Sequence, residues 1–260
     1  MDQIFNLEIL KITSVLFVAA LSGIVGVFAL TRRMTLAADA MSHIALPGLG
    51  LAVMFKIDPL IGGGLALVLG ALLVWALERK TKISAETVIG VIFSASLALG
   101  SLLIHSGEEL LDALFGNIGS LTFNESIFGI MASIIIIALI LKLKSKFTLS
   151  FISEDIARVS GINTSLINLT FLLCFVVAII LGLKFLGALL MGSLVIIPAA
   201  SSRNLAKSLN TDLLISVLIA IISVISGLII SSKFNLELGP IIVVSAAFIF
   251  FISVTLKTED

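Results

Sequence analysis

The chain has little of what most metal and redox sites are built from. Its 260 residues include one cysteine, Cys174, and two histidines, His43 and His105. A single cysteine excludes a disulfide within the chain and a metal cluster held by cysteines. The H-E-x-x-H motif of zinc proteases is absent, and two histidines argue against a three-ligand site of that kind. The sequence therefore does not favour an intramembrane zinc enzyme.

Charge is also scarce. Only 12% of the residues are charged and the net charge is zero, so nothing points to a nucleic acid or another strongly charged partner. No basic region precedes the first apolar run, so we expect no cleaved signal peptide. No stretch is long and polar enough for a soluble catalytic domain, and no linker divides the chain. We therefore expect one domain over 1–260, with any nucleotide hydrolysis carried out by another subunit.

What the chain has in abundance is apolar sequence. Hydrophobic residues make up 59% of it, and the mean hydropathy is +1.26, which predicts an all-α, polytopic transmembrane helical bundle. About eight to nine segments have the length needed to cross a bilayer core of roughly 30 Å. The seventh is short and is expected to end at Pro198, and 107–121 is expected to form a short external helix or a re-entrant piece. The expected spans are 9–31, 36–55, 59–78, 85–106, 122–143, 165–183, 185–200, 211–231 and 239–256.

The lysines and arginines predict the orientation of these spans. With nine crossings and the N-terminus outside, twelve of the sixteen basic residues fall on the cytoplasmic side. The opposite orientation would invert that ratio. Because cytoplasmic loops carry the excess of Lys and Arg, we expect an outside N-terminus and an inside C-terminus in the cytoplasmic membrane.

One expected span carries two ionisable side chains. The stretch LAADAMSHIALPGLG (36–50) contains Asp39 and His43, which are four residues apart and so share one helix face. Ionisable groups at membrane depth are costly and usually face a bundle interior or a water-filled path. Pro47 follows one turn later and predicts a bend there.

The Asp39–His43 pair has three interpretations. Carboxylate oxygen and imidazole nitrogen together suit zinc, manganese or iron(II), so the pair is a candidate metal site in a translocation path. It could equally be a proton relay in a proton-coupled secondary transporter, or a structural hydrogen bond that locks the helix. His105, which is followed by Glu108, Glu109 and Asp112, is interpreted as part of a solvated external rim.

The longest cytoplasmic loop, 143–164, contains a short helical pattern, ISEDIARVSGINTS. Ser153 is a candidate N-cap and Gly161 a candidate helix stop. Ile152, Ile156 and Val159 fall on one helical face, which predicts a helix that lies on the membrane surface or docks into a cytoplasmic partner. Elsewhere, Glu78, Glu86 and Asp212 are interpreted as interfacial charges, and small residues such as those at 62–64 and 192–193 as close helix contacts.

Three stretches together resemble the membrane subunit of ATP-binding-cassette importers for zinc, manganese or iron(II), the metal-chelate type. They are RRMTLAADAMSHIALPGLGLA (32–52), ISEDIARVSGIN (152–163) and FLGALLMGSLVIIPAASSRNLAKS (185–208). The similarity covers nearly the whole chain in the right order. The chain departs at Ser201 and Ser202, where the family usually has Thr-Ala or Ala-Ala.

This resemblance implies a type II importer permease, zinc being the foremost cargo, with no permanently bound cofactor and no catalytic activity of its own. It implies a second permease copy in a homodimer, two cytoplasmic ATPase subunits and an extracytoplasmic metal-binding protein. Asp39 and His43 match positions proposed to hold the metal. The 152–163 helix would pass ATP-driven motion to the membrane subunit, through Glu154, Asp155, Ala157, Arg158 and Gly161.

Overall fold

The computed structural model describes residues 2–34, 36–81, 83–103 and 121–256, and it is helical throughout, with no strand in those ranges. The predicted all-α membrane bundle is thereby confirmed. Eight helical segments of the described chain are long and apolar enough to cross a membrane, with α2 and α3 counted as one. The helices are α1 (Asp2–Thr31), α2 (Ala37–Ile44), α3 (Leu46–Met54), α4 (Pro59–Thr81), α5 (Ala85–Leu103), α7 (Phe123–Ile152), α8 (Glu154–Val159), α9 (Thr164–Leu186), α10 (Ala188–Leu205), α11 (Leu209–Phe234) and α12 (Leu238–Thr255).

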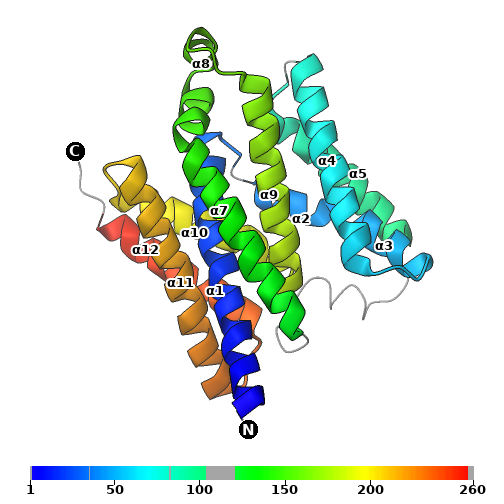
Figure 1. Ribbon diagram of the computed structural model, residues 1–260, viewed down its shortest axis with the longest axis vertical. Helices are drawn as coiled ribbons and strands as arrows, with labels where there is room; N and C mark the ends of the chain where they lie inside the picture. Colours follow the sequence, from blue (N-terminus) through cyan, green and yellow to red (C-terminus); the bar gives the residue numbers. More distant parts are fainter. Residues whose placement is uncertain (1, 35, 82, 104–120, 257–260) are drawn as a thin grey trace.

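The helices form two groups, which are joined by α9 and by the packing of α10 against α2. α1 packs against α7, α10 and α11, with α12 against α10 and α11, while α2 to α5 pack together on the other side of α9 (Figure 1). The small residues allow close approach, as predicted. Gly48 of α3 and Gly62 of α4 face each other so closely that a methyl group on Gly62 would lie 2.3 Å from the Gly48 carbonyl oxygen.

Contacts between helix ends show which ends lie together. Arg203, near the end of α10, donates to Thr31, the last residue of α1, and Asn204 donates to Ser253 near the end of α12. Arg32 pairs with Glu78 near the end of α4. At the opposite end, Lys184 of α9 pairs with Glu125 of α7. The chain therefore enters α1 at one end of the bundle and leaves α12 at the other.

Two sequence predictions about helix ends are wrong. The expected loop from 143 is largely helix, because α7 continues to Ile152 and buries Phe147 against Phe28 and Phe171. The seventh segment does not end at Pro198, since α10 runs through this proline to Leu205. Membrane helices tolerate an internal proline where neighbouring groups satisfy the freed backbone, so Pro198 lies inside α10 without ending it.

Candidate functional site: an Asp–His pair and an exposed cytoplasmic helix

Asp39 and His43 lie one turn apart on α2, as their spacing predicts. The His43 Nε2 and Asp39 Oδ1 atoms are 4.0 Å apart, and the Asp39 side chain is 58% exposed while that of His43 is 22% exposed. At this distance the pair is not locked by a short hydrogen bond. Both side chains therefore remain available to a third group placed between or beyond them.

The other faces of α2 are packed. Ala38 and Met41 are fully buried, and the buried Ser42 hydroxyl donates to the Asp39 carbonyl oxygen at 2.7 Å. The His43 ring lies 5.6 Å from the Phe93 ring of α5, and its Nδ1 atom is buried without a hydrogen-bond partner among the described residues. The pair thus sits on an ordered helix with one accessible face.

A glycine of α10 sets the distance between α10 and the pair. A methyl group built on Gly192 would lie 3.0 Å from both Cα and Cβ of Asp39 and 3.1 Å from its Oδ1. Contacts this short require the neighbour to move. The sequence identified Gly192 only as a packing residue, because nothing in a sequence shows which side chain a distant glycine faces.

The helix that carries the pair is interrupted close to His43. α2 ends at Ile44 and α3 begins at Leu46, so the break lies before Pro47 and nearer the pair than predicted. Pro47 occupies the first turn of α3, where a missing N–H removes no hydrogen bond within α3. The predicted bend is present, and the proline begins the second helix.

The described residues of a single chain supply too few ligands for a complete transition-metal site. The described residues contain no group of three or more His, Cys, Asp or Glu side chains that could hold a metal. Zinc sites in proteins take three or four protein ligands. Asp39 and His43 can therefore supply half of a four-ligand site. His105, Glu108, Glu109 and Asp112 lie outside the described residues.

α8 forms where the sequence predicted a short helix, although it is shorter than 152–163. The Ser153 hydroxyl accepts a hydrogen bond from the Ile156 amide, and Gly161 ends the turn with φ at +77°. Ala157 is fully buried against the bundle. The Arg158 guanidinium pairs with the Glu154 carboxylate at 2.6 Å, on the exposed surface of the helix.

The apolar residues of this region face away from the protein. Ile152 is 72% exposed, Ile156 57% and Val159 91%. Ile152 is the last residue of α7, while Ile156 and Val159 belong to α8. A soluble surface rarely leaves three large aliphatic side chains so close together in the chain uncovered, and such patches mark interaction sites. The predicted amphipathic face therefore exists and has no partner within the described chain.

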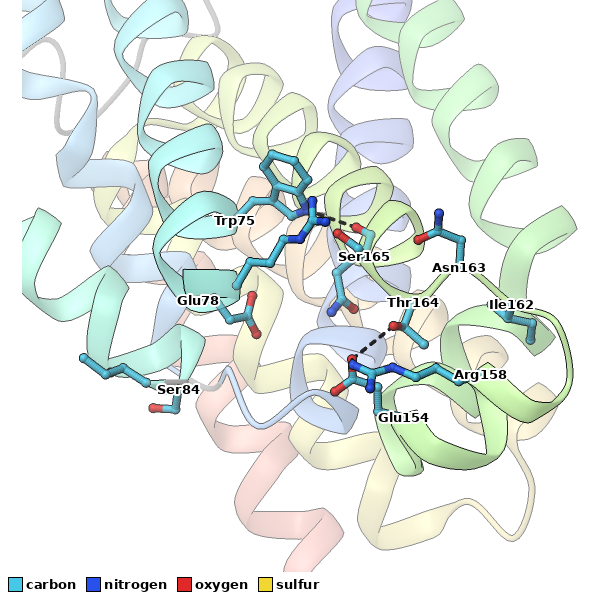
Figure 2. Close-up of a pocket in the computed structure, with 12 residues that line it drawn as sticks. Trp75, Glu78, Ser84, Glu154, Arg158, Ile162, Asn163, Thr164 and Ser165 are labelled. Carbon is cyan, nitrogen blue, oxygen red and sulfur yellow. Dashed lines mark hydrogen bonds and ion pairs between the residues drawn. The ribbon is translucent and has the colours of Figure 1, made fainter. Parts of the chain in front are cut away.

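Behind α8 lies a polar cavity of about 710 Å³, between the end of α4 and the beginning of α9 (Figure 2). The Trp75 indole donates to the Ser165 carbonyl across it, and the Thr164 hydroxyl donates to Glu154. Sequence reasoning missed this cavity, because its walls come from helices far apart in the chain. Its lining residues are Trp75, Glu78, Arg79, Ile83, Ser84, Glu154, Arg158, Ile162, Asn163, Thr164, Ser165 and Asn168.

Glu78 is one half of a buried ion pair and not merely an interfacial charge. The Arg32 guanidinium, which is 7% exposed, contacts the Glu78 carboxylate at 2.7 Å and lies over the Phe151 and Phe171 rings. Burial lowers the pKa of Arg32, and the Glu78 carboxylate opposes that shift. The residue directly after α1 is thereby fixed to α4, α7 and α9.

Asp212 likewise differs from its interpretation as an interfacial charge. It is 4% exposed, accepts a hydrogen bond from the Ser202 hydroxyl at 2.6 Å and pairs with Arg203 at 3.1 Å. Ser202 is one of the two residues where the sequence departs from the family pattern. Its hydroxyl has a definite use here, since it satisfies a buried carboxylate.

Comparisons with known proteins agree with this architecture. The sequence model of the ABC 3 transport family matches residues 6–257. The chain is 32% identical over 252 residues to the high-affinity zinc uptake system membrane protein ZnuB of Haemophilus influenzae, covering 92% of this chain and 96% of that protein. It is also 32% identical over 245 residues to the manganese transport system membrane protein MntC of Listeria monocytogenes, covering 93% and 87%.

A solved structure shares the fold as well. PsaBC from Streptococcus pneumoniae, in complex with Fab, aligns with a TM-score of 0.81 and 28% sequence identity. The alignment covers 94% of this chain and 89% of that chain. The resemblance drawn from the three sequence stretches is confirmed.

Proposed function

Because the chain belongs to the ABC 3 transport family, we propose that it is the membrane-spanning permease subunit of an ATP-driven importer. Its cargo is a divalent transition metal, with zinc foremost and manganese or iron(II) next. The observation that carries this proposal is the partly exposed Asp39–His43 pair on a membrane helix. Relatives described as zinc and manganese transport proteins support the class of cargo.

We propose that the metal site is completed by a second copy of the chain. One chain contributes one oxygen and one nitrogen ligand, so a two-fold related copy would give an Asp₂His₂ set. Four ligands of this kind suit zinc, and they also accept manganese or iron(II). The 58% exposure of the Asp39 side chain supports this arrangement, since that face of α2 is open in the single chain.

A transport site must also release its cargo. Conduction requires binding strong enough for entry and weak enough for exit. A site shared between two copies meets this requirement, because a small separation of the copies would divide the ligand set. The His43 Nε2 and Asp39 Oδ1 atoms are 4.0 Å apart, too far for a hydrogen bond between them. This distance supports a pair whose two side chains are free to bind one metal ion.

ATP hydrolysis belongs to separate cytoplasmic subunits in this proposal, and the permease itself is not an enzyme. α8 is the contact that receives their motion, with the exposed Ile156 and Val159 as its docking face. Within the proposed coupling set, Glu154 and Arg158 brace the helix through their ion pair and Ala157 anchors it to the bundle. Asp155 places charge in its first turn, and Gly161 permits the sharp turn after it.

The alternative of a proton-coupled secondary transporter is not favoured. Such a transporter needs no cytoplasmic partner, so the exposed apolar face of α8 would have no role. An importer of this family would also receive its metal from an extracytoplasmic binding protein. The two classes are separated by whether metal uptake requires an ATPase subunit.

Substitution of the pair tests the proposal directly. We expect Asp39→Asn and His43→Ala each to abolish uptake of zinc, manganese and iron(II) in cells that lack the native system. The reason is that each change removes one of only two donors per chain. Uptake of radioactive metal and the amount of protein in the membrane fraction are measured together.

Asp58→Asn is the matched control, since Asp58 lies in the turn before α4 and accepts from the Leu60 amide, which asparagine can also do. We expect it to transport normally. Normal uptake in either Asp39→Asn or His43→Ala would refute the metal role of the pair.

A further inference from the structure

The cavity behind α8 has one cation that has no counter-charge among the described residues. Two glutamates and two arginines line it, and the pairs Glu78–Arg32 and Glu154–Arg158 account for both carboxylates. Arg79 forms no ion pair within the described residues, and its guanidinium lies 5.6 Å from the Trp75 ring centroid. The cavity with the Arg32 guanidinium behind it therefore carries a net charge of plus one, which a monoanion would neutralise.

The cavity also offers a polar atom that lacks a partner among the described residues. The Asn168 side chain lines it, and its Oδ1 atom, a hydrogen-bond acceptor, is buried without a partner. Asn163, Thr164 and Ser165 line the wall where α9 begins, so the positive end of that helix dipole lies at the same place. An arginine and a helix N-terminus are suited to the oxygens of a phosphate group, and the Asn168 oxygen is suited to a hydroxyl donor attached to it.

The cavity lies on the side of α8 away from Ile156. Glu154 and Arg158 border the cavity, whereas Ile156 is two residues, or about 200°, around the helix from each of them. A protein bound over Ile156 would therefore sit away from the cavity entrance. This geometry favours an occupant from the membrane side.

The surroundings of the cavity correspond to the headgroup layer of a bilayer. Trp75 is the only tryptophan of the chain, and tryptophan concentrates at membrane interfaces. Three leucines that neighbour cavity-lining residues in the sequence are exposed. Leu73 and Leu77 of α4 are 53% and 38% exposed, and Leu166 of α9 is 58% exposed. Acyl chains can lie against these leucines while a headgroup enters the polar space.

We propose that this cavity binds the headgroup of an anionic phospholipid from the leaflet at the α8 end. The phosphate would contact Arg79, a hydroxyl of the headgroup would donate to the Asn168 Oδ1 atom, and Trp75 would lie at the level of the lipid glycerol. A lipid in this position lies directly behind α8 and stabilises the arrangement of α4, α8 and α9. This proposal does not depend on which metal is transported, because the cavity shares no residue with the Asp39–His43 pair.

Lipid binding to the purified full-length protein tests the proposal. Native mass spectrometry in detergent micelles would count bound lipids during titration with phosphatidylglycerol, phosphatidylcholine or inorganic phosphate. We expect phosphatidylglycerol to bind in preference to phosphatidylcholine, and Arg79→Gln to weaken it about tenfold, the usual effect of losing a charged hydrogen bond. Asn168→Leu should weaken it in the same direction, and it provides the test if Arg79→Gln does not fold.

Lys80→Gln is the matched control, because Lys80 is exposed on the same helix end and does not line the cavity. It should bind phosphatidylglycerol as the unaltered protein does. Equal loss in Lys80→Gln would show a diffuse surface charge and overturn the site. Equal binding of phosphatidylcholine would also overturn it, as would thermal stabilisation by inorganic phosphate that matches the lipid, which would make free phosphate the ligand.

Discussion

At the scale of single residues, the position of Asp39 depends on a glycine in another helix. Gly192→Ala places a methyl group 3.0 Å from the Asp39 Cα and Cβ atoms, so α2 must shift away from α10. We expect metal uptake to fall severalfold, because Asp39 must give by a few tenths of an ångström, and a misplacement of about 1 Å at such a group can cost about 100-fold. Uptake per unit of membrane-inserted protein is the measurement.

Gly90→Ala is the comparison for this change, since an added methyl group there meets nothing within 4 Å. Its uptake should equal that of the unaltered protein. Equal uptake by Gly192→Ala would mean that the position of Asp39 tolerates the shift, and that Gly192 acts in packing alone.

The Arg32–Glu78 pair provides a prediction about stability. Glu78→Gln leaves the Arg32 guanidinium, 7% exposed, without its counter-charge. Breaking a buried pair from one side costs about 3 kcal/mol, whereas replacing both members costs less. We expect Glu78→Gln to lower the free energy of unfolding in mixed micelles by about that amount, and the double variant with Arg32→Gln to recover part of it.

A smaller loss in the double variant than in the single one is the sign of a true pair. If the two changes destabilise additively, Arg32 and Glu78 act independently, and the 2.7 Å contact contributes nothing specific.

The sequence could predict some of these residues and not others, for a physical reason. Asp39 and His43 are neighbours through the helix period, which the sequence contains. Gly192 meets Asp39, and Arg32 meets Glu78, only through packing between distant segments. Asp212 shows the same limit, since its burial follows from how α10 and α11 meet.

At the scale of elements, local capping signals were reliable and segment ends were less so. Ser153 caps α8 and Gly161 ends the turn after it, both as predicted from residue type. The continuation of α7 to Ile152 was missed, because lysines at 142, 144 and 146 resemble a loop when read as charges. Phe147 on the inner face stabilises the helical continuation of α7, since it packs in an aromatic cluster with Phe171.

The exposed face of α8 supplies the element-scale prediction. Val159→Asp places a charge on a side chain that is 91% exposed, so the fold should not change. If this face docks into an ATPase subunit, a buried uncompensated carboxylate should reduce co-purification of that subunit by about tenfold or more. Co-purification from membranes that contain both subunits is the measurement.

Leu236→Asp makes the same chemical change at a side chain 55% exposed, beyond the end of α11 and at the opposite end of the bundle. It should leave the ATPase bound. Unaltered co-purification with Val159→Asp would remove α8 from the proposed coupling contact.

At the scale of the whole molecule, the ends of the helices alternate in a way that supports nine crossings. α10 begins beside the Lys184–Glu125 end and finishes beside Thr31, so it traverses the bundle although it is not one of the eight apolar spans. The basic residues Arg32, Arg79 and Arg203 share the α8 end, because Arg79 lines the cavity with Glu154 and Arg158, Arg32 pairs with Glu78, and Arg203 contacts Thr31. The predicted excess of positive charge on one side matches this grouping.

This arrangement predicts the position of the C-terminus. A reporter fused after Asp260 should be active in the cytoplasm, since positive loops stay on that side. Fusions at Asp260 and at the N-terminus would be compared with reporters that work on only one side of the membrane. A reporter after Asp260 that is active outside would contradict the nine-crossing topology.

The eight apolar spans of the described chain were predictable because each is long enough to span a bilayer, a property of length and composition. Their arrangement was not, because neighbours such as α9 and α4 meet through packing and through one Trp75–Ser165 hydrogen bond. Within the candidate site, the sequence indicated the ligands and the helix. Which faces stay open became visible only once the bundle was assembled.

The separation of α1's first residue from α12's last has an evolutionary corollary. Two tandem copies joined in one polypeptide by a short connector would point in opposite directions across the bilayer, since the second copy would start on the side where the first finished. A parallel fused pair needs an additional crossing in its connector. Duplication of such a gene should therefore yield separate polypeptides that pair after insertion, and a single-chain version designed in the laboratory must include an extra helix.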